Sequence, residues 1–192
     1  GLGDVYKRQA VDALCARFGK DLPCPTHFVH LPALPVVNAR FKAFDEARFQ
    51  KDWEIQVHSA VKLCKAVLPA MSKAKFGRVL FIQTSYTIGC PPKNTAAYVM
   101  NKSAIGGLVK SLAVEYARFG ITVNCVAPSM METHFLKDTP DLIVQAAAAD
   151  NPMGRNATPE DVAPAMAFLL SEEARFILSL IHISEPTRHA QI

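Results

Sequence analysis

The sequence has no apolar run as long as a membrane span, no large excess of one charge and no paired cysteine motif. Its 192 residues include 21 Lys and Arg against 17 Asp and Glu, and the positive residues are scattered rather than gathered in a stripe with aromatic residues between them. The composition therefore gives no reason to expect membrane insertion or nucleic-acid binding. Half of the residues are hydrophobic, so the chain can bury the core of one ordinary domain.

Cysteine usage points to a reducing compartment, which we expect to be the cytoplasm. The five cysteines are an odd number and form no C-x-x-C pair, which argues against a disulfide framework and against structural zinc. His27 and His30 are too isolated in the sequence to form a ligand set, so we predict no metal site. The five cysteines are Cys15, Cys24, Cys64, Cys90 and Cys125.

The two ends of the chain differ from the rest. Residues 1–9 (GLGDVYKRQ) and residues 178–192 (LSLIHISEPTRHAQI) follow neither the helical nor the strand period, and both resemble translated sequencing-library adapters. We expect them to be non-native tails on a partial domain of residues 10–177. The alternative is a genuine but unusual pair of tails.

Short apolar runs alternate with amphipathic segments between these ends. The patterns predict strands over residues 26–31, 78–84 and 121–126, and helices over residues 10–18, 53–72, 98–118, 141–149 and from Thr158 onward. Residues 41–53 are predicted to be a mixed connection. This alternation predicts an α/β fold with a doubly wound, Rossmann-like parallel sheet.

One stretch, SYTIGCPPKNTAAYVMNK, carries the candidate chemistry. Ser85 follows a predicted strand, and Tyr98 and Lys102 lie one helical turn apart at the start of a predicted helix. In an open parallel sheet ligands bind at the carboxyl ends of the strands, so all three are expected at one edge. An ammonium near a phenol favours the phenolate, so we expect Lys102 to lower the pKa of Tyr98. Such a phenol suits proton transfer to or from an alcohol oxygen, which Ser85 would hold.

Each of these residues has a simpler interpretation when taken alone. Tyr98 and Lys102 could form a solvated helix face, because Y-x-x-x-K arises often by chance, and Ser85 could be a strand-end cap. Their combination at the same sheet edge favours a catalytic set. The set suits reversible conversion of a carbonyl and an alcohol, with hydride carried by a cofactor because no side chain carries hydride.

Ser85, a gap of twelve residues and Tyr98-x-x-x-Lys102 together resemble the signature of the short-chain dehydrogenase/reductase family. The resemblance extends over residues 10–177. It includes a segment similar to the family's active-site helix, next strand and cofactor-side loop (AAYVMNKSAIGGLVKSLAVEYARFGITVNCVAPSMMETHF). Two further segments are similar to the family's late region (NPMGRNATPEDVAPAMAFLLSEEARFI) and to its helix ending in LPxM (DWEIQVHSAVKLCKAVLPAM).

The resemblance implies a role for each matched residue. Tyr98 would be the acid/base, Ser85 would orient the carbonyl, and Lys102 would lower the pKa of the phenol and bond the nicotinamide ribose. In the loop PSMMET, where Ser129 replaces the family's usual glycine, three residues would contact the nicotinamide: Pro128, Met131 through its backbone, and Thr133 through its hydroxyl.

The sequence departs from the family pattern in three places. It contains no T-G-x-x-x-G-x-G turn to cradle a pyrophosphate, which implies a truncated Rossmann-like domain that is inactive alone. Residues 30–33 (HLPA) stand where the family has Asn-Asn-Ala-Gly. Gln56 stands where the family has its fourth catalytic residue, an asparagine, with His58 and Ser59 as nearby alternatives.

The resemblance implies an NAD(P)-dependent oxidoreductase, with NADP slightly favoured over NAD. Its substrate would be a small-molecule ketone or secondary alcohol, such as a 3-oxoacyl compound. The longer enzyme is expected to be a homodimer or homotetramer built on its two long helices. The alternative is a noncatalytic Rossmann-like scaffold that associates through those helices, although a scaffold would have no need of the three candidate residues.

Overall fold

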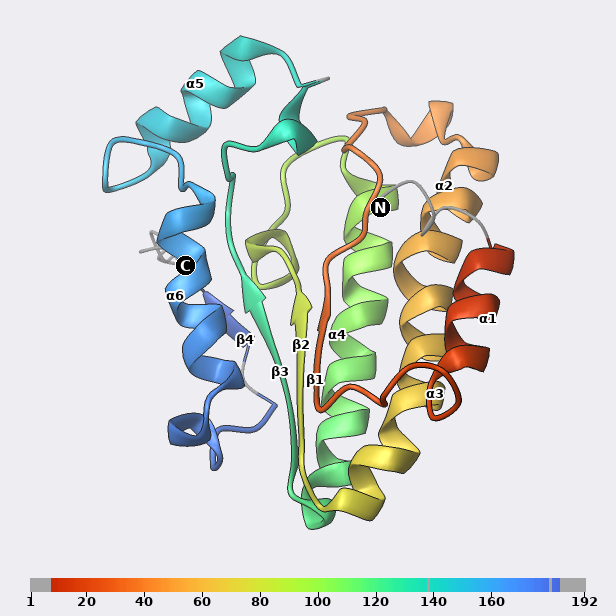
Figure 1. The fold of residues 1–192 in the computed structure, drawn as a ribbon. Coiled ribbons are helices and arrows are strands. Elements are labelled where there is room, and N and C mark those ends of the chain that lie inside the picture. The colour runs from red at the N-terminus through yellow and green to blue at the C-terminus, as the bar shows by residue number, and fades with distance from the viewer. Residues whose placement is uncertain (1–7, 138, 180, 184–192) are drawn as a thin grey trace.

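The computed structural model describes residues 8–137, 139–179 and 181–183, which form a parallel sheet between layers of helix (Figure 1). Four strands lie in the order β1-β2-β3-β4, and each neighbouring pair is parallel. Helices cover both faces of the sheet, so the predicted α/β fold with a parallel, Rossmann-like sheet is confirmed. The strands are β1 (His27–His30), β2 (Gly77–Ile82), β3 (Ile121–Ala127) and β4 (Ile181–Ile183).

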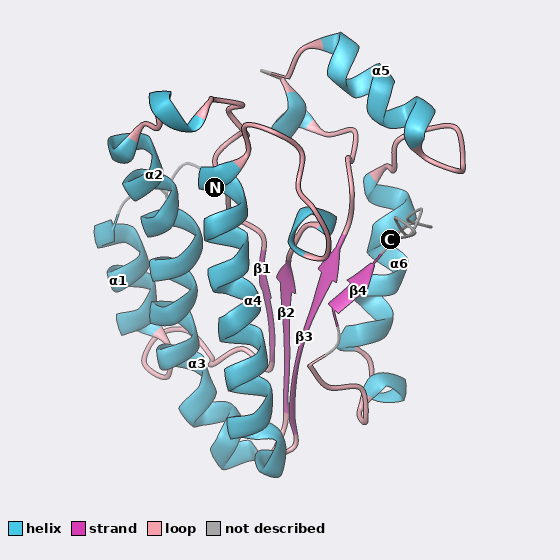
Figure 2. Cartoon of the chain, turned by 180° about the vertical axis from the view of Figure 1, so that it is seen from behind, coloured by secondary structure: helices cyan, strands magenta, loops and turns pink. Residues whose placement is uncertain are grey.

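The helices divide between the two faces of the sheet (Figure 2). The larger helical layer contains α3 and α4, with α1 packed against α3. Helix α6 covers the other face, and α5 lies beyond the ends of the strands. The helices are α1 (Arg8–Arg17), α2 (Glu46–Trp53), a π-helix (Glu54–His58), α3 (Ser59–Ala74), α4 (Ala96–Tyr116), α5 (Asp141–Asp150) and α6 (Pro159–Leu170). Short 3-10 helices cover Phe41–Ala43, Ser85–Thr87, Ala117–Phe119, His134–Leu136 and Glu172–Ala174.

Strands β2 and β3 are apolar enough to be covered from both sides. Every residue of β3 is buried, and one core packs Phe81 and Val123 against Val109 of α4. A second core packs Leu80 and Val126 against the α6 face. Continuous burial of this kind is typical of parallel strands between two helical layers.

Two predicted elements differ from the structure. The connection predicted over residues 41–53 contains α2, because the Asp45 side chain caps the helix by accepting a hydrogen bond from the Arg48 N–H at 2.9 Å. The helix predicted to end near Ser72 continues to Ala74, so Pro69 lies inside α3 rather than in its last turn.

The terminal segments fall only partly within the described residues. Residues 1–7, 180 and 184–192 lie outside them, whereas α1 begins at Arg8 and Ile181–Ile183 pair with Cys125–Ala127. The boundaries at residues 10 and 177 stay a prediction. Within the described part of the chain, no helix is long and apolar enough to cross a membrane.

Candidate active site

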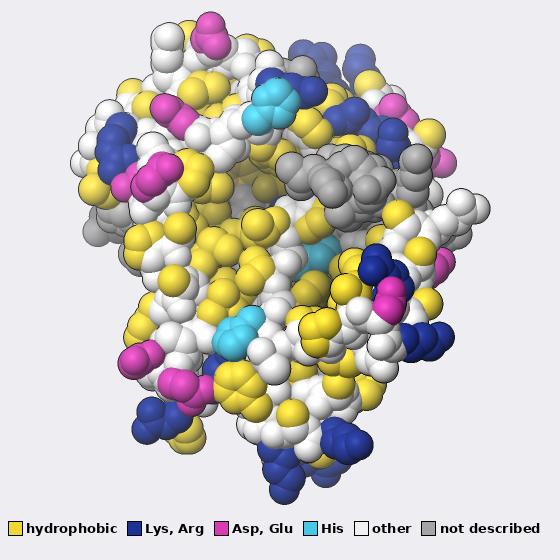
Figure 3. All heavy atoms as spheres, viewed as in Figure 1, with side chains coloured by type: hydrophobic (Ala, Val, Ile, Leu, Met, Phe, Trp, Pro, Cys, Tyr) yellow, Lys and Arg dark blue, Asp and Glu magenta, His cyan; other side chains and the backbone are white. Residues whose placement is uncertain are grey.

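A cavity of about 630 Å³ lies at the carboxyl ends of β2 and β3, where the sequence predicts a site. Its lining comes from the loops that follow β1, β2 and β3, from the start of α4 and from α6. The lining is mostly apolar, and Figure 3 shows hydrophobic side chains gathered around a hollow in this face of the molecule. Apolar lining residues include Ile82, Met130, Phe135, Leu136 and Met166.

Tyr98 and Lys102 both line this cavity from the first two turns of α4. The Lys102 ammonium is almost fully buried and donates a hydrogen bond to the Ile82 carbonyl oxygen at 3.0 Å. It lies 5.8 Å from the centroid of the Tyr98 ring. The structure therefore brings the predicted phenol and ammonium together in one cavity.

The electrostatics of this pair differ from the sequence expectation. Burial raises the pKa of Tyr98 well above its ordinary value, and a hydrogen bond to the Thr84 side chain lowers it only in part. In the chain as it stands the pKa is raised, because loss of solvent disfavours the phenolate more than nearby groups favour it. The lowering of this pKa by Lys102 stays a prediction. Burial also lowers the pKa of Lys102, to about 8.

Two aromatic rings fix the orientation of Tyr98. Tyr86 meets it edge to face with 6.3 Å between ring centroids, and Phe135 packs on it at the same separation. Both neighbours also line the cavity. The phenol is thus held between the loop after β2 and the loop after β3.

Thr84, next to Ser85, also has a hydroxyl near Tyr98. Thr84 is buried, has extended backbone angles, and its side chain lowers the pKa of Tyr98. The carbonyl-orienting role of Ser85 stays a prediction. The N–H of Ser85 donates to the Pro128 carbonyl oxygen at 3.1 Å, and Ser85 is not among the described residues that line the cavity. Sequence reasoning missed Thr84, although its position next to Ser85 was a usable signal.

Gln56 lies inside the π-helix and is buried, with its amide directed to another side chain. Its Nε2 donates to Asp52 Oδ2 at 2.7 Å, while its Oε1 has no hydrogen-bond partner among the described residues. The alternatives at this position are engaged elsewhere: His58 pairs with Glu54 at 2.8 Å, and Ser59 bonds His30 at 2.9 Å. The role of Gln56 as fourth catalytic residue stays a prediction.

The loop after β3 brings Pro128, Met131 and Thr133 to the cavity. A bridge to Ala157 uses the carbonyl of Met130 and the N–H of Glu132, at 3.2 and 2.8 Å. In a parallel bridge this arrangement leaves the N–H and C=O of Met131 pointing the other way. The loop therefore offers backbone groups that suit a carboxamide, as predicted for a nicotinamide.

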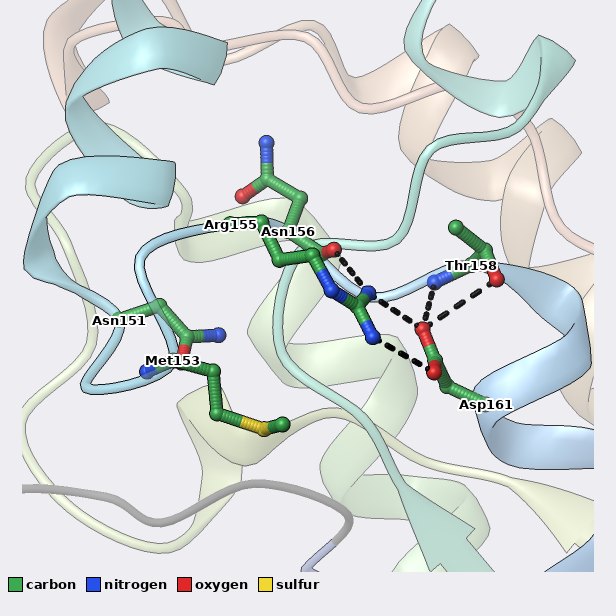
Figure 4. Close-up of polar contacts among 6 residues, drawn as sticks. All are labelled: Asn151, Met153, Arg155, Asn156, Thr158 and Asp161. Carbon is green, nitrogen blue, oxygen red and sulfur yellow. Dashed lines mark hydrogen bonds and ion pairs between the residues drawn. The ribbon is translucent and has the colours of Figure 1, made fainter.

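A polar cluster at the start of α6 holds this wall of the cavity (Figure 4). Arg155 binds the Asp161 carboxylate through both terminal nitrogens, at 2.6 and 2.8 Å. Asp161 also accepts from the Thr158 N–H at 2.8 Å, closing the first turn of the helix. Val162 and Met166, farther along α6, line the cavity.

No metal site competes with this interpretation in the described part of the chain. There, no three His, Cys, Asp or Glu side chains gather in a way that could hold an ion. The residues present do fit the nicotinamide end of a dinucleotide. One cavity contains the Lys102 ammonium, the Tyr98 phenol and Met131, whose backbone groups are not used in the bridge to Ala157. They do not include a glycine-rich phosphate cradle, which is absent from the printed sequence.

Comparisons with known proteins show what the chain is similar to. A family model described as enoyl-(acyl carrier protein) reductase matches residues 2–183. The cis-4-hydroxycyclohexanecarboxylate dehydrogenase of Sinomonas cyclohexanicum is 33% identical over 180 residues, which are 93% of this chain and 71% of that protein. The 3-oxoacyl-acyl-carrier-protein reductase FabG of Vibrio cholerae is 37% identical over 133 residues, which are 67% of this chain and 54% of that protein.

Solved structures show the same fold. The gluconate 5-dehydrogenase of Burkholderia cenocepacia, whose crystals contain NADP and tartrate, superposes with a TM-score of 0.84 at 21% identity. That comparison covers 94% of this chain and 71% of the dehydrogenase. The chain spans about half to three quarters of the length of the proteins described here.

Proposed function

Because the chain belongs to the short-chain dehydrogenase/reductase family, we propose that it forms the substrate-binding and proton-transfer part of an NAD(P)-dependent oxidoreductase. The reaction is the interconversion of a ketone and a secondary alcohol. The observation that carries the proposal is the cavity shared by Tyr98 and Lys102 at the carboxyl edge of the sheet. The nicotinamide cofactor supplies or accepts the hydride when it is bound.

Within this proposal, Tyr98 exchanges the proton with the substrate oxygen. Its phenol is protonated at neutral pH because burial raises its pKa, so in the chain as it stands it is ready to donate a proton. Thr84 or Ser85 orients the substrate oxygen, and the Thr84 hydrogen bond to Tyr98 favours Thr84. Lys102, Pro128, Met131 and Thr133 are the residues proposed to hold the nicotinamide end of the cofactor.

We favour an apolar ketone as substrate, with a 3-oxoacyl compound as the first to test. The cavity lining is mostly apolar, and two similar reductases, those of Vibrio cholerae and Mycobacterium tuberculosis, are named for 3-oxoacyl substrates. The dehydrogenase of Sinomonas cyclohexanicum is named for an alicyclic hydroxy acid, so cyclic ketones form the second group to test.

Turnover in a chimera tests the proposal. The glycine-rich amino-terminal segment of the Vibrio cholerae reductase would precede residue 10, and NADPH oxidation would be followed with both groups of ketones. We expect turnover, and we expect Tyr98→Phe to reduce kcat by about 10²-fold or more because the ring remains and only the hydroxyl that carries the proton is lost. A folded chimera whose turnover survives Tyr98→Phe would exclude the acid/base role.

The remaining features are proposed for the longer enzyme from which this chain would derive. We favour NADP over NAD, and comparing NADPH with NADH in that longer protein tests the preference. The free state of all five cysteines supports a cytoplasmic location.

A homodimer or homotetramer would pair α3 and α4 with a partner copy, which is consistent with exposed Val61, Met100 and Val114 on or beside those faces. Val114→Glu should then shift sedimentation toward the monomer.

A further inference from the structure

A buried carboxylate, Asp52, lies beside the Tyr98 and Lys102 pair. It occupies the last turn of α2 and is 9% exposed. Three N–H groups donate to it: the Leu34 backbone at 2.8 Å, Gln56 Nε2 at 2.7 Å and Asn101 Nδ2 at 3.0 Å. Among the described residues, no lysine or arginine lies within ion-pair distance of it.

This hydrogen-bond pattern suits the carboxylate form of Asp52. An ionised carboxylate only accepts hydrogen bonds, and the three partners of Asp52 all donate. Gln56 and Asn101 both turn their nitrogens to it and leave their oxygens without partners among the described residues. Leaving these two buried oxygens without hydrogen bonds costs free energy. The hydrogen bonds that both amides donate to the Asp52 carboxylate offset that cost.

Asp52 is close to the reacting pair in two ways. Its partner Asn101 directly precedes Lys102 on α4, and Asp52 and Tyr98 both border a second, smaller cavity of about 60 Å³. Asp52 and Lys102 are both buried, and charges interact more strongly in the protein interior than at the surface.

We infer that Asp52 is a positioning residue whose negative charge keeps Lys102 an ammonium. This is the protonation state from which reduction of a carbonyl begins, and in that sense the inference rests on the proposed function. The pKa shifts have the matching signs. Burial lowers the pKa of Lys102 to about 8 and the charge of Asp52 opposes that fall, while the same charge adds to the rise for Tyr98.

Other ionisable groups around the pair have weaker claims to this role. His30 is neutral at pH 7, since burial and the Lys102 charge lower its pKa to about 4. Burial raises the pKa of Cys125 to about 11, so its thiol is protonated at pH 7. The groups that face the pair from the surrounding elements are His30 from β1, Asp52 from α2, Tyr86 from the loop after β2 and Cys125 from β3.

An NMR titration of the 192-residue chain tests the inference without requiring activity. Lysine labelled at Cε would report the Lys102 midpoint, assigned with Lys102→Met. We expect a midpoint near 8 in the wild type. In Asp52→Asn we expect it to fall by about one pH unit, because the isosteric amide keeps the shape but removes the charge.

Two further variants separate charge from structure. Glu46→Gln removes a charge from an exposed position of the same helix and should leave the Lys102 midpoint unchanged. Asp52→Glu keeps the charge and should restore the midpoint most of the way to the wild-type value. A folded Asp52→Asn variant with the wild-type midpoint would overturn the inference and leave Asp52 a purely structural residue.

A measurement on the wild type covers the case in which Asp52→Asn does not fold. The carboxyl carbon of Asp52, labelled with ¹³C, should show an inflection at the Lys102 midpoint, because interacting groups report one another's titration. A flat response there would also overturn the inference. Failure of the chimera to turn over ketones would contradict the proposed function but not the inference about Asp52, since these titrations do not depend on turnover.

Discussion

Tyr98 lies between opposing influences from residues that are far apart in the sequence. The Thr84 hydrogen bond lowers the pKa of its phenol, whereas burial and the charge of Asp52 raise it. Burial is the largest of these effects, so the phenol stays protonated in the chain without a bound ligand. The hydroxyls of Thr84 and Ser85 are the groups proposed to orient a substrate oxygen toward this proton.

The contacts of Thr84 and Ser85 predict unequal effects on turnover. In the chimera, Thr84→Ala should lower kcat/KM by about 10²-fold, because it removes the hydroxyl that reaches Tyr98. Ser85→Ala should have a smaller effect, because the recorded contact of Ser85 at this edge is made by its backbone N–H. Steady-state kinetics of the two variants check this ordering, and the reverse order would return the carbonyl-orienting role to Ser85.

At the scale of the elements, the start of α6 shapes the site, and the end of α4 leads the chain into β3 at the opposite edge of the sheet. The first turn of α6 is closed by Asp161, and residues of that helix line the cavity. The turn after α4 must reverse within a few residues to feed β3, and Gly120 makes this possible with φ of 72°.

Removing the Asp161 charge should destabilise the protein in a pH-dependent way. The Arg155 guanidinium, followed by the Thr158 N–H, holds the pKa of Asp161 well below its usual range. A carboxyl with a depressed pKa in the folded state stabilises above the unfolded-state pKa, and this stabilisation is lost as pH falls through the folded value. Asp161→Asn should therefore unfold at lower urea than the wild type near pH 7, with a difference that shrinks in acid.

Glu160→Gln provides the matched control for Asp161. It removes the same charge from the same exposed helical turn without touching Arg155. Chemical denaturation at several pH values should show little change for this variant. A constant difference between Asp161→Asn and the wild type down to the most acidic pH would contradict the ion-pair explanation.

Two glycines, one in the middle of α4 and one in the turn after it, should respond oppositely to alanine. Gly120→Ala forces a side chain into left-handed backbone and places Cβ against the Lys75 carbonyl oxygen, so we expect a loss of about 1–3 kcal/mol in the free energy of unfolding. Gly107 lies in the exposed helix interior with open space around it, so Gly107→Ala should gain about 0.5–1 kcal/mol. Urea denaturation measures both, and equal signs would refute the backbone argument.

At the scale of the whole molecule, the residues proposed to hold a nicotinamide share one cavity, whereas the sequence lacks the family's pattern for holding the phosphates. The cavity combines Lys102, Tyr98 and the loop after β3, whereas no T-G-x-x-x-G-x-G pattern occurs in the printed sequence. A dinucleotide gains much of its binding from backbone N–H groups that cradle its phosphates.

The 192-residue chain should accordingly bind NADP poorly. Isothermal calorimetry is expected to show no saturable heat with micromolar NADP, while the chimera that carries a glycine-rich segment should bind. Micromolar binding by the unmodified chain would mean that residues outside the family pattern hold the phosphates.

The alternation of strands and helices was predictable from the sequence. Apolar runs such as residues 78–84 and 121–126 have few ways to bury themselves other than as parallel strands between helices. The cap at Thr158 and the spacing of Tyr98 and Lys102 are local, since both depend on the geometry of one helical turn. These local rules determined the fold class and half of the candidate site.

Only the tertiary structure decided the rest of the site. Thr84 and Ser85 are adjacent, but Thr84 is extended whereas Ser85 begins a 3-10 helix, so the position at which β2 ends decides where each hydroxyl lies. Asp52 falls in a segment that the sequence predicts as a mixed connection, and only the packing of α2 against α4 buries it. Burial and charge at Tyr98 arise between segments distant along the chain, and no local pattern encodes how much solvent they exclude.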